Sequence, residues 1–406
     1  MRAMHLSGRT LLLRAALLAA IVPAAWGTFG TALAADPPAA AEPLATSNPS
    51  DPIKALIKLC EPPGVPPQSG EQIQNCHTLH LYEIMQAQGP AIGMLALYQT
   101  AEASPAFANL CHVAAHHLSE VMYGMLGNVS EAMALCREGC TYGCQHAVLK
   151  THLRGLPPDT VPDFERLCPH DPQRLYSYQQ WNCTHGVGHG LAHYFADVSQ
   201  ALSACNRFSL SLERRRCAQG VFMEHALEIV RTQAPPSAPG HHLALCAAVE
   251  AQQRRDCYLH FITLVYWATG GSVPAMFIEC QKVASADQAG CYWGIGRGLA
   301  ALYIEREDEL PTVCRTGSAA FTDECILGFA SVLVNVKGLD RGFGFCGKLA
   351  EEVRIRCVER MGQWTRLLRE NKEEAATECR KAGAPRYVQA CLSAKFDGEE
   401  PSTFAP

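Results

Sequence analysis

The chain has 406 residues, of which 48% are hydrophobic and 18% are charged, and its formal net charge is −5. This composition supplies enough apolar side chains for a buried core and excludes an intrinsically disordered chain. The small negative charge excludes a protein that binds nucleic acid by neutralising a run of phosphates.

The first 34 residues predict a secretory signal peptide. Arginines at positions 2, 9 and 14 precede an apolar run over residues 15–25, and Ala32-Leu33-Ala34 provides a small-residue cleavage site. A retained membrane anchor is the alternative, because the apolar run can be extended to Ala34. Pro23 and Gly27 favour removal, so we expect a periplasmic or secreted protein.

Two further segments are predicted to lack regular structure. Residues 35–54 are rich in alanine, proline and serine and predict a flexible linker, and residues 397–406 predict a disordered tail. No segment after the signal peptide has the ~20 consecutive apolar residues of a transmembrane helix. All 20 cysteines follow residue 34, and disulfides are their expected state in a secreted chain.

The cysteines of the C-terminal half mark an internal repeat. They occur in pairs whose members are separated by ten or eleven residues, and the first members of successive pairs lie 41, 34, 34, 32 and 33 residues apart. A period of 33 or 34 residues is the length of a helix-turn-helix unit. The six predicted pairs are Cys205–Cys217, Cys246–Cys257, Cys280–Cys291, Cys314–Cys325, Cys346–Cys357 and Cys379–Cys391.

Each unit predicts a short amphipathic helix, a polar turn and a longer apolar helix. The short helix ends at the first cysteine, as in Val198–Cys205, and the second cysteine opens the longer helix, as in residues 217–229. Residues 212–216 are an example of the predicted turn. Glycine in a helix interior is less favourable than alanine by about 1 kcal/mol. A glycine that recurs at one position therefore needs another reason, and we expect neighbouring helices to be in close contact there. Glycines three residues after a second cysteine are Gly186, Gly220, Gly294 and Gly328.

One such unit cannot bury its apolar face alone, so the units are expected to stack into an all-α solenoid of helical hairpins with about one disulfide each. Closing a loop of about 12 residues contributes roughly 3 kcal/mol in the chain-entropy model. The period and the disulfides over residues 168–391 resemble secreted, cysteine-rich relatives of the tetratricopeptide solenoids, by spacing alone. We therefore divide the chain into an N-terminal His/Cys-rich helical region, residues 55–200, and disulfide-linked repeats, residues 201–396.

The same cysteine frame extends upstream less regularly. Aligning the string Cys144-Gln-His with Cys183-Thr-His suggests how the cysteines between residues 111 and 144 pair. Four cysteines can pair in three ways, so the two alternative pairings stay open at this point. The predicted upstream pairs are Cys60–Cys76, Cys111–Cys140, Cys136–Cys144 and Cys168–Cys183.

Histidines are confined to the first part of the chain. Of the 16 histidines, all but one lie between His77 and His260, and the last 146 residues contain none. Those last residues keep the cysteine repeat, so the disulfide frame does not require histidine. Another role must explain why histidine is enriched upstream.

Histidines at helical spacing form the densest cluster. His185, His189 and His193 are four residues apart and share one face of a predicted helix. His112 and His116 repeat the same spacing. Two histidines at i and i+4 can hold one metal ion from a single helix, with a neighbouring helix completing the coordination.

The repeat brings in a further histidine. His146 and His185 each lie two residues after a cysteine, and equivalent positions of neighbouring solenoid units lie side by side. We therefore expect these two side chains to be neighbours on adjacent helices. The same position in later units is occupied by Gln219, Leu259, Trp293 and Leu327.

Together these residues predict a transition-metal site. Neutral imidazole is a common ligand of zinc, copper, nickel and iron, and cysteines held in disulfides supply no thiolate. Met122 and Met125 favour copper slightly, and Glu120 and Glu224 are carboxylates that could orient a histidine or act as a base. Copper or zinc is the expected ion, with iron or haem as alternatives. The predicted ligands are His112, His116, His146, His185, His189 and, at the far end of its helix face, His193.

Other interpretations stay open. The histidine face could be a polar stripe, or a buried stripe bonded to backbone carbonyls. Haem held non-covalently by two histidines is compatible with the sequence, whereas the C-x-x-C-H string of covalent haem and the H-E-x-x-H string of metalloproteases do not occur. The histidines expected to be structural are His77, His80, His152, His170, His241, His242 and His260.

Two functions from different classes follow. The first is a secreted or periplasmic helical-repeat protein with a transition-metal or haem site in its N-terminal half. The second is a metal-free solenoid whose face binds a protein or peptide partner. A sequence reveals neither a substrate cleft nor an open coordination position, so catalysis is left open.

Overall fold

The computed structural model has an all-α fold, as the repeat predicts. No strand occurs among the residues that the structure describes. The predicted signal peptide and tail lie outside the described residues, whereas residues 51–54 of the predicted linker belong to the first helix, where Pro52 suits the first helical turn. The described residues are 51–63, 70–108, 110–157, 160, 163–169, 177–195, 197–232 and 240–396.

The helices before residue 200 differ widely in length. In chain order they are α1 (Asp51–Cys60), α2 (Gly70–Gln88), α3 (Pro90–Ala103), α4 (Pro105–Ala108), α5 (Cys111–Leu126), α6 (Val129–Leu135), the 3-10 turn η1 (Cys140–Tyr142), α7 (Gly143–Arg154), α8 (Phe164–Leu167) and α9 (Tyr178–Tyr194).

The later helices alternate between short and long as far as residue 347, after which one long helix is followed by two short helices. In chain order the later helices are α10 (Val198–Cys205), α11 (Ser211–Thr232), α12 (Gly240–Ala247), α13 (Ala251–Ala268), α14 (Val273–Gln281), α15 (Gln288–Tyr303), η2 (Glu307–Glu309), α16 (Leu310–Cys314), η3 (Ala319–Phe321), α17 (Thr322–Gly347), α18 (Glu351–Leu368), α19 (Lys372–Cys379), η4 (Arg380–Ala382) and α20 (Pro385–Leu392).

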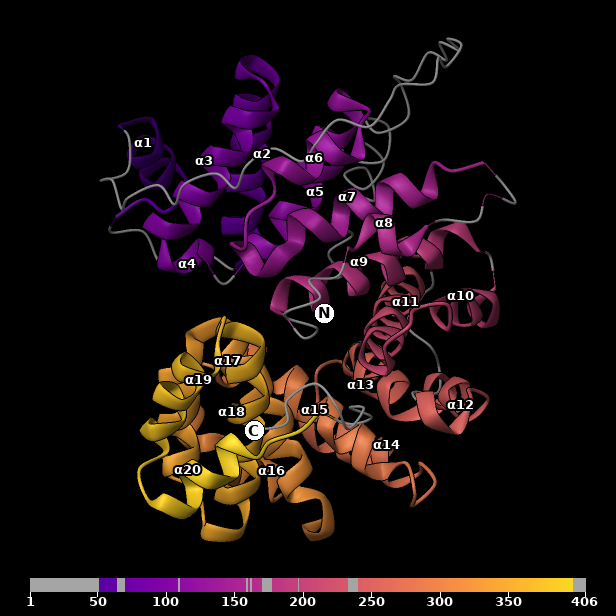
Figure 1. The fold of residues 1–406 in the computed structure, drawn as a ribbon, viewed down its shortest axis with the longest axis vertical. Helices are drawn as coiled ribbons and strands as arrows, with labels where there is room; N and C mark the ends of the chain where they lie inside the picture. Colours follow the sequence, from indigo (N-terminus) through magenta and orange to yellow (C-terminus); the bar gives the residue numbers. More distant parts are fainter. Residues whose placement is uncertain are drawn as a thin grey trace, which may run out of the picture. The chain divides into compact units, whose positions relative to one another are not determined.

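The longer helices form a continuous row in which each contacts the next. The row runs α5, α7, α9, α11, α13, α15, α17, α18 and α20 (Figure 1). Four short helices of the C-terminal half, α10, α12, α14 and α16, each pack on the longer helix that follows, and α19 packs on α20, which has the same length. Stacking of neighbouring hairpins therefore buries the apolar faces, as the length of the repeat predicts.

Ten disulfides hold these hairpins, and none of the cysteines is free. They join the same ten pairs that the spacing predicts, including the two pairs assigned by alignment between residues 111 and 144. Complete pairing indicates an oxidising environment. The pairs are Cys60–Cys76, Cys111–Cys140, Cys136–Cys144, Cys168–Cys183, Cys205–Cys217, Cys246–Cys257, Cys280–Cys291, Cys314–Cys325, Cys346–Cys357 and Cys379–Cys391.

The predicted polar turn at residues 212–216 is wrong, because α11 begins at Ser211 and includes it. Arg215 in this stretch donates from Nε and Nη2 to the two carboxylate oxygens of Asp256 on α13, at 3.0 and 3.1 Å. The charged residues are therefore paired across the helix row, which stabilises them in a helix. The disulfide consequently reaches the interior of α11 at Cys217.

Glycines bring successive long helices into close contact, as predicted. A Cβ on Gly220 of α11 would collide with the carbonyl oxygen of His185 on α9, and one on Gly328 of α17 would collide with the carbonyl oxygen of Trp293 on α15. Both contacts join a glycine to the residue two positions after a cysteine in the preceding helix. The repeat thus sets the helix spacing directly beside His185.

One described helix, Ala319–Gly347, is long and apolar enough to cross a membrane by length and composition. The sequence analysis expected no such segment, because charged residues interrupt its apolar run. Half of the apolar window is buried inside the protein, and Gly338, at φ +83°, breaks the helical geometry within it. Burial and this break are typical of a core helix.

The close contact at Gly220 gives a testable prediction. The variant Gly220→Ala should be destabilised by about 1–3 kcal/mol, because the added methyl forces α9 and α11 apart. Gly344 on α17 is the matched control, since no atom lies within 4 Å of a Cβ placed there. Gly344→Ala should be neutral or stabilising by about 0.4–1 kcal/mol. Urea unfolding of the oxidised chains measures both, and equal effects at the two sites would contradict the packing argument.

Candidate metal centre

Five of the six predicted ligands converge from three neighbouring helices. His112 and His116 lie on α5, His146 on α7, and His185 and His189 on α9. The ring of His146 is central, and its centroid lies 5.1 Å from that of His185, so the predicted adjacency is confirmed. The distances from His146 to His112, His116 and His189 are 5.5, 5.6 and 5.6 Å.

A strained turn before α7 orients His112. Cys140, Thr141 and Tyr142 all have positive φ, at 55°, 48° and 59°. Such residues cost roughly 1–2 kcal/mol each and persist only where the surroundings enforce them. Here the disulfides of Cys140 and Cys144 flank the turn. The turn places the Cys140 carbonyl 3.0 Å from His112 Nδ1, with the Thr141 hydroxyl at 2.7 Å.

The hydrogen-bond partners of three histidines determine which ring nitrogen is free. His112 Nδ1 contacts the Cys140 carbonyl, His185 Nδ1 the Arg216 carbonyl at 3.3 Å, and His189 Nδ1 the Glu224 carboxylate at 2.8 Å. Carbonyl and carboxylate oxygens only accept, so Nδ1 carries the proton in each ring. The unprotonated Nε2 of each neutral ring is then the ligand atom.

The Nε2 atoms of His185 and His189 lie 3.2 Å apart. Two neutral rings with donating Nδ1 atoms would place two lone pairs opposite each other at this distance, and a proton or a metal cation between them makes the contact favourable. Two nitrogen ligands of one tetrahedral zinc, each at ~2.05 Å, are separated by roughly 3.3 Å. The pair therefore has the spacing of two ligands on one ion.

His146 is 3% exposed, and neither of its ring nitrogens has a hydrogen-bond partner. The Asn182 side chain lies nearby, but its amide donates to the Tyr178 carbonyl at 2.7 Å. His116 Nε2 is likewise buried without a partner. An unsatisfied buried polar atom costs about 1–3 kcal/mol, so three such atoms in one cluster indicate a missing ligand.

The ligand nitrogens form two groups of three, and within each group all pairs lie within 4.8 Å. The first group, called the α5–α7 triad below, is His112, His116 and His146. The second, the α7–α9 triad, is His146, His185 and His189. His146 belongs to both.

Burial keeps these imidazoles neutral. Desolvation is the largest cause that lowers the pKa of His116, His146 and His185 well below 6.5, and the neighbouring histidines lower it further. A neutral imidazole has the lone pair that a metal requires. These three rings are thus in their ligating form near neutral pH.

His193 is the one predicted ligand that lies outside both triads. Its Nε2 contacts the carboxylate of Glu224 at 2.9 Å, because one further helical turn carries it past the cluster to α11. Burial raises the pKa of the Glu224 carboxyl, but hydrogen bonds from His189 and His193 and the charge of Lys150 hold it below its ordinary value. Glu224 therefore stays ionised and orients His189, as carboxylates behind metal-bound histidines do.

The other predicted supporting residues have different roles. Glu120 pairs with Lys150 at 3.0 Å rather than with a histidine. Met122 packs in the apolar core, and Met125 is exposed with the Gln86 amide 3.9 Å from its sulfur. The methionine argument for copper therefore has no structural support.

Three of the seven histidines expected to be structural, His77, His80 and His152, have side-chain partners, although His77 Nδ1 is buried without one. His77 contacts Glu61 at 2.7 Å, and His152 contacts the Tyr123 hydroxyl at 3.0 Å. His170 and the side chains of His241 and His242 lie outside the described residues.

His260, which the sequence predicts to be structural, lies beside the histidine cluster. It is 7% exposed, its Nε2 has no partner, and its ring centroid lies 6.0 Å from that of His185. It lies three residues after Cys257, whereas the repeat alignment pointed to the second position. Its position beside His185 follows from how α9 and α13 are rotated about their axes, and the cysteine spacing does not give that rotation.

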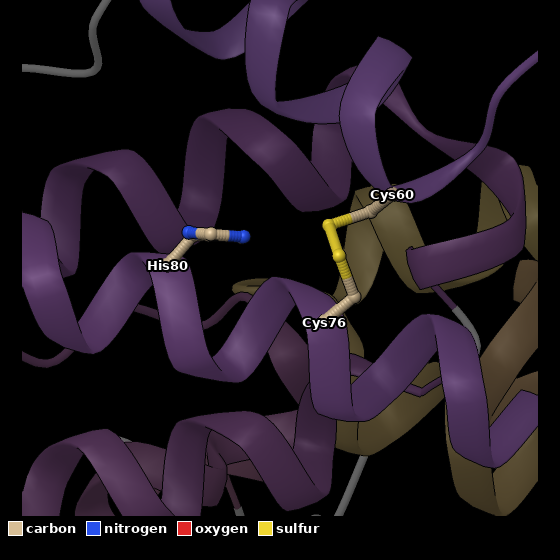
Figure 2. Close-up of side chains that lie close together, drawn as sticks. All are labelled: Cys60, Cys76 and His80. Atoms are coloured by element: carbon tan, nitrogen blue, oxygen red, sulfur yellow. A yellow bond between two sulfur atoms is a disulfide. The ribbon is translucent and has the colours of Figure 1, made fainter.

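A third group, Cys60, Cys76 and His80, also brings ligand types together (Figure 2). Its two sulfurs are bonded to each other, as Figure 2 shows, so neither is a thiolate. His80 Nδ1 contacts Glu83 at 2.8 Å. This group is a disulfide beside a surface histidine and provides a control for the cluster.

Comparison with models of protein families, with curated proteins and with solved structures found no match. The candidate site is therefore argued from its geometry alone.

The role of Glu224 gives a testable prediction. Glu224→Gln should weaken zinc binding by about 10–100-fold, because His189 loses the carboxylate that holds its tautomer. Competition with a chromophoric chelator measures the affinity. Glu378→Gln is the matched control: this carboxylate on α19 pairs with Arg369 and Lys381 and contacts no histidine in the described part of the chain. Equal losses in the two variants would remove Glu224 from the site.

Proposed function

We propose that this protein binds transition-metal ions in the periplasm or outside the cell, through imidazoles of α5, α7 and α9. The observation that carries the proposal is the facing pair of Nε2 atoms on His185 and His189, whose Nδ1 protons are already engaged. The unpartnered nitrogens of His146 lie beside that pair.

The donor set favours copper(II) or zinc. All cysteines are in disulfides, which excludes thiolate ligands, and the two triads offer only imidazole nitrogen. Imidazole suits both ions, and copper(II) binds more tightly than zinc to a given nitrogen site. Haem is less well supported, since two axial ligands on opposite faces of one iron lie ~4 Å apart and the His185–His189 pair is closer. A metal-free peptide-binding solenoid gives no reason for the buried imidazoles.

Elemental analysis of the full chain, purified from an oxidising compartment, tests this function. We expect at least one equivalent of copper or zinc per chain, and a melting temperature that falls when a chelator removes it. The double variant His185→Ala/His189→Ala should lose the metal but remain folded, because the disulfides do not involve these residues. His80→Ala should retain it. A metal-free chain whose melting ignores chelators would contradict the proposal.

We further propose that His146 bridges two ions. One nitrogen binds one ion, His146 belongs to both triads, and both of its nitrogens are unpartnered. Binding of the second ion would displace the remaining ring proton to solvent and leave a bridging imidazolate.

Metal stoichiometry tests the bridge. The wild-type chain should bind two copper(II) ions whose unpaired spins couple, which reduces the paramagnetic resonance signal per copper. His116→Ala and His189→Ala each remove a ligand from one triad, so each variant should bind one ion with an uncoupled signal. One ion in the wild-type chain would overturn the bridge while leaving metal binding intact.

A further inference from the structure

A cavity of about 660 Å³ adjoins the histidine cluster. Two positions of the repeat contribute many of its wall residues. They lie two and six residues after the second cysteine of a pair, so they share one helix face. The first position contributes His146, His185, Gln219, Leu259 and Trp293, and the second contributes Met223, Arg297, Ser331 and Gln363. The cavity thus continues the row of His146 and His185 along the later helices.

Two arginines on the cavity wall share one carboxylate with a third. Burial lowers the pKa of the Arg216 guanidinium on α11 and of the Arg297 guanidinium on α15, and the charge of Asp256 opposes both shifts. Asp256 already forms an ion pair with Arg215. Arg216 donates to the neutral Gln219, while its Nε is buried without a partner. Burying three cations around one carboxylate is costly, so their presence indicates a further anion that completes the site.

Aromatic rings surround these charges. Trp181, Trp293 and Trp364 line the cavity, and the guanidinium of Arg216 lies over the ring of Trp181. Tyr178 packs against Trp364 with centroids 5.6 Å apart. Indole faces bind planar apolar groups by stacking. The cavity is also much larger than an inorganic anion requires.

His260 completes the polar end of the cavity. It lines the wall, its buried Nε2 is unpartnered, and the charges of Arg216 and Arg297 both act on it. Its ring lies beside His185, so this end of the cavity meets the α7–α9 triad. A polar group bound there would be next to the metal centre.

We propose that this cavity binds a planar aromatic carboxylate. The carboxylate is held by the guanidinium groups of Arg216 and Arg297, which present paired donors in the geometry that a carboxylate accepts. The ring lies among the three tryptophans. Binding does not require the metal ions, so this site is tested separately from the proposed metal function.

Titration calorimetry of the full chain with three probes tests the ligand class. We expect 2-naphthoate to bind both the metal-loaded and the chelator-treated chain. The neutral amide 2-naphthamide should bind at least about tenfold more weakly, since it lacks the charge that the arginines compensate. Inorganic phosphate should bind more weakly than 2-naphthoate. Equal binding of the amide overturns the role of the arginines, and equal binding of phosphate overturns the aromatic class.

Variants of Arg297 locate the site. Arg297→Met should weaken 2-naphthoate binding by at least about tenfold, and Arg297→Lys should restore part of it. Arg306→Met is the matched control, since Arg306 also lies over an aromatic ring, that of Tyr303, but outside the cavity. Removing one of three cations around a single carboxylate should not lower the melting temperature of Arg297→Met. Strong destabilisation, or unchanged naphthoate binding, would overturn the proposal, as would failure of the wild-type chain to bind 2-naphthoate.

Discussion

The disulfide between the two helices of each hairpin is the constraint on which the rest of the structure depends. It fixes the register of a short helix against a long one, so each long helix presents the same sequence positions to its neighbours. Where a glycine lies three residues after the second cysteine, as at Gly220 and Gly328, the preceding long helix approaches to backbone contact. Fixed register and close spacing together align one position of every unit along a single face.

That face changes its chemistry along the row of helices. At α7 and α9 the aligned position holds His146 and His185, and at α15 it holds Trp293 beside Arg297. The histidine cluster is therefore continuous with a cavity that has cationic and aromatic walls. Both depend on the same register, which explains how side chains distant in the sequence act on one another, as Arg297 does on His260.

Cross-links that stabilise the fold also allow it to hold groups that destabilise it. Buried imidazoles without partners, buried arginines that share one carboxylate and a left-handed turn at Cys140–Tyr142 each raise the free energy of the unliganded chain. A disulfide contributes several kcal/mol through the unfolded state, independently of the polarity of the neighbouring site. The frame can therefore keep its binding groups in place before any ligand arrives.

The sequence by itself determined the helical class, the ten cysteine pairs and five of the clustered histidines, because period and helical spacing are local properties of the chain. It did not determine the start of α11, since the pairing of Arg215 with Asp256 depends on a neighbouring unit. Nor did it place His193 outside the two triads or His260 beside the cluster. Both outcomes depend on the rotation of each helix about its axis relative to its neighbour. Only the tertiary structure decided which nitrogens face one another, because burial and contacts across helices determine that arrangement.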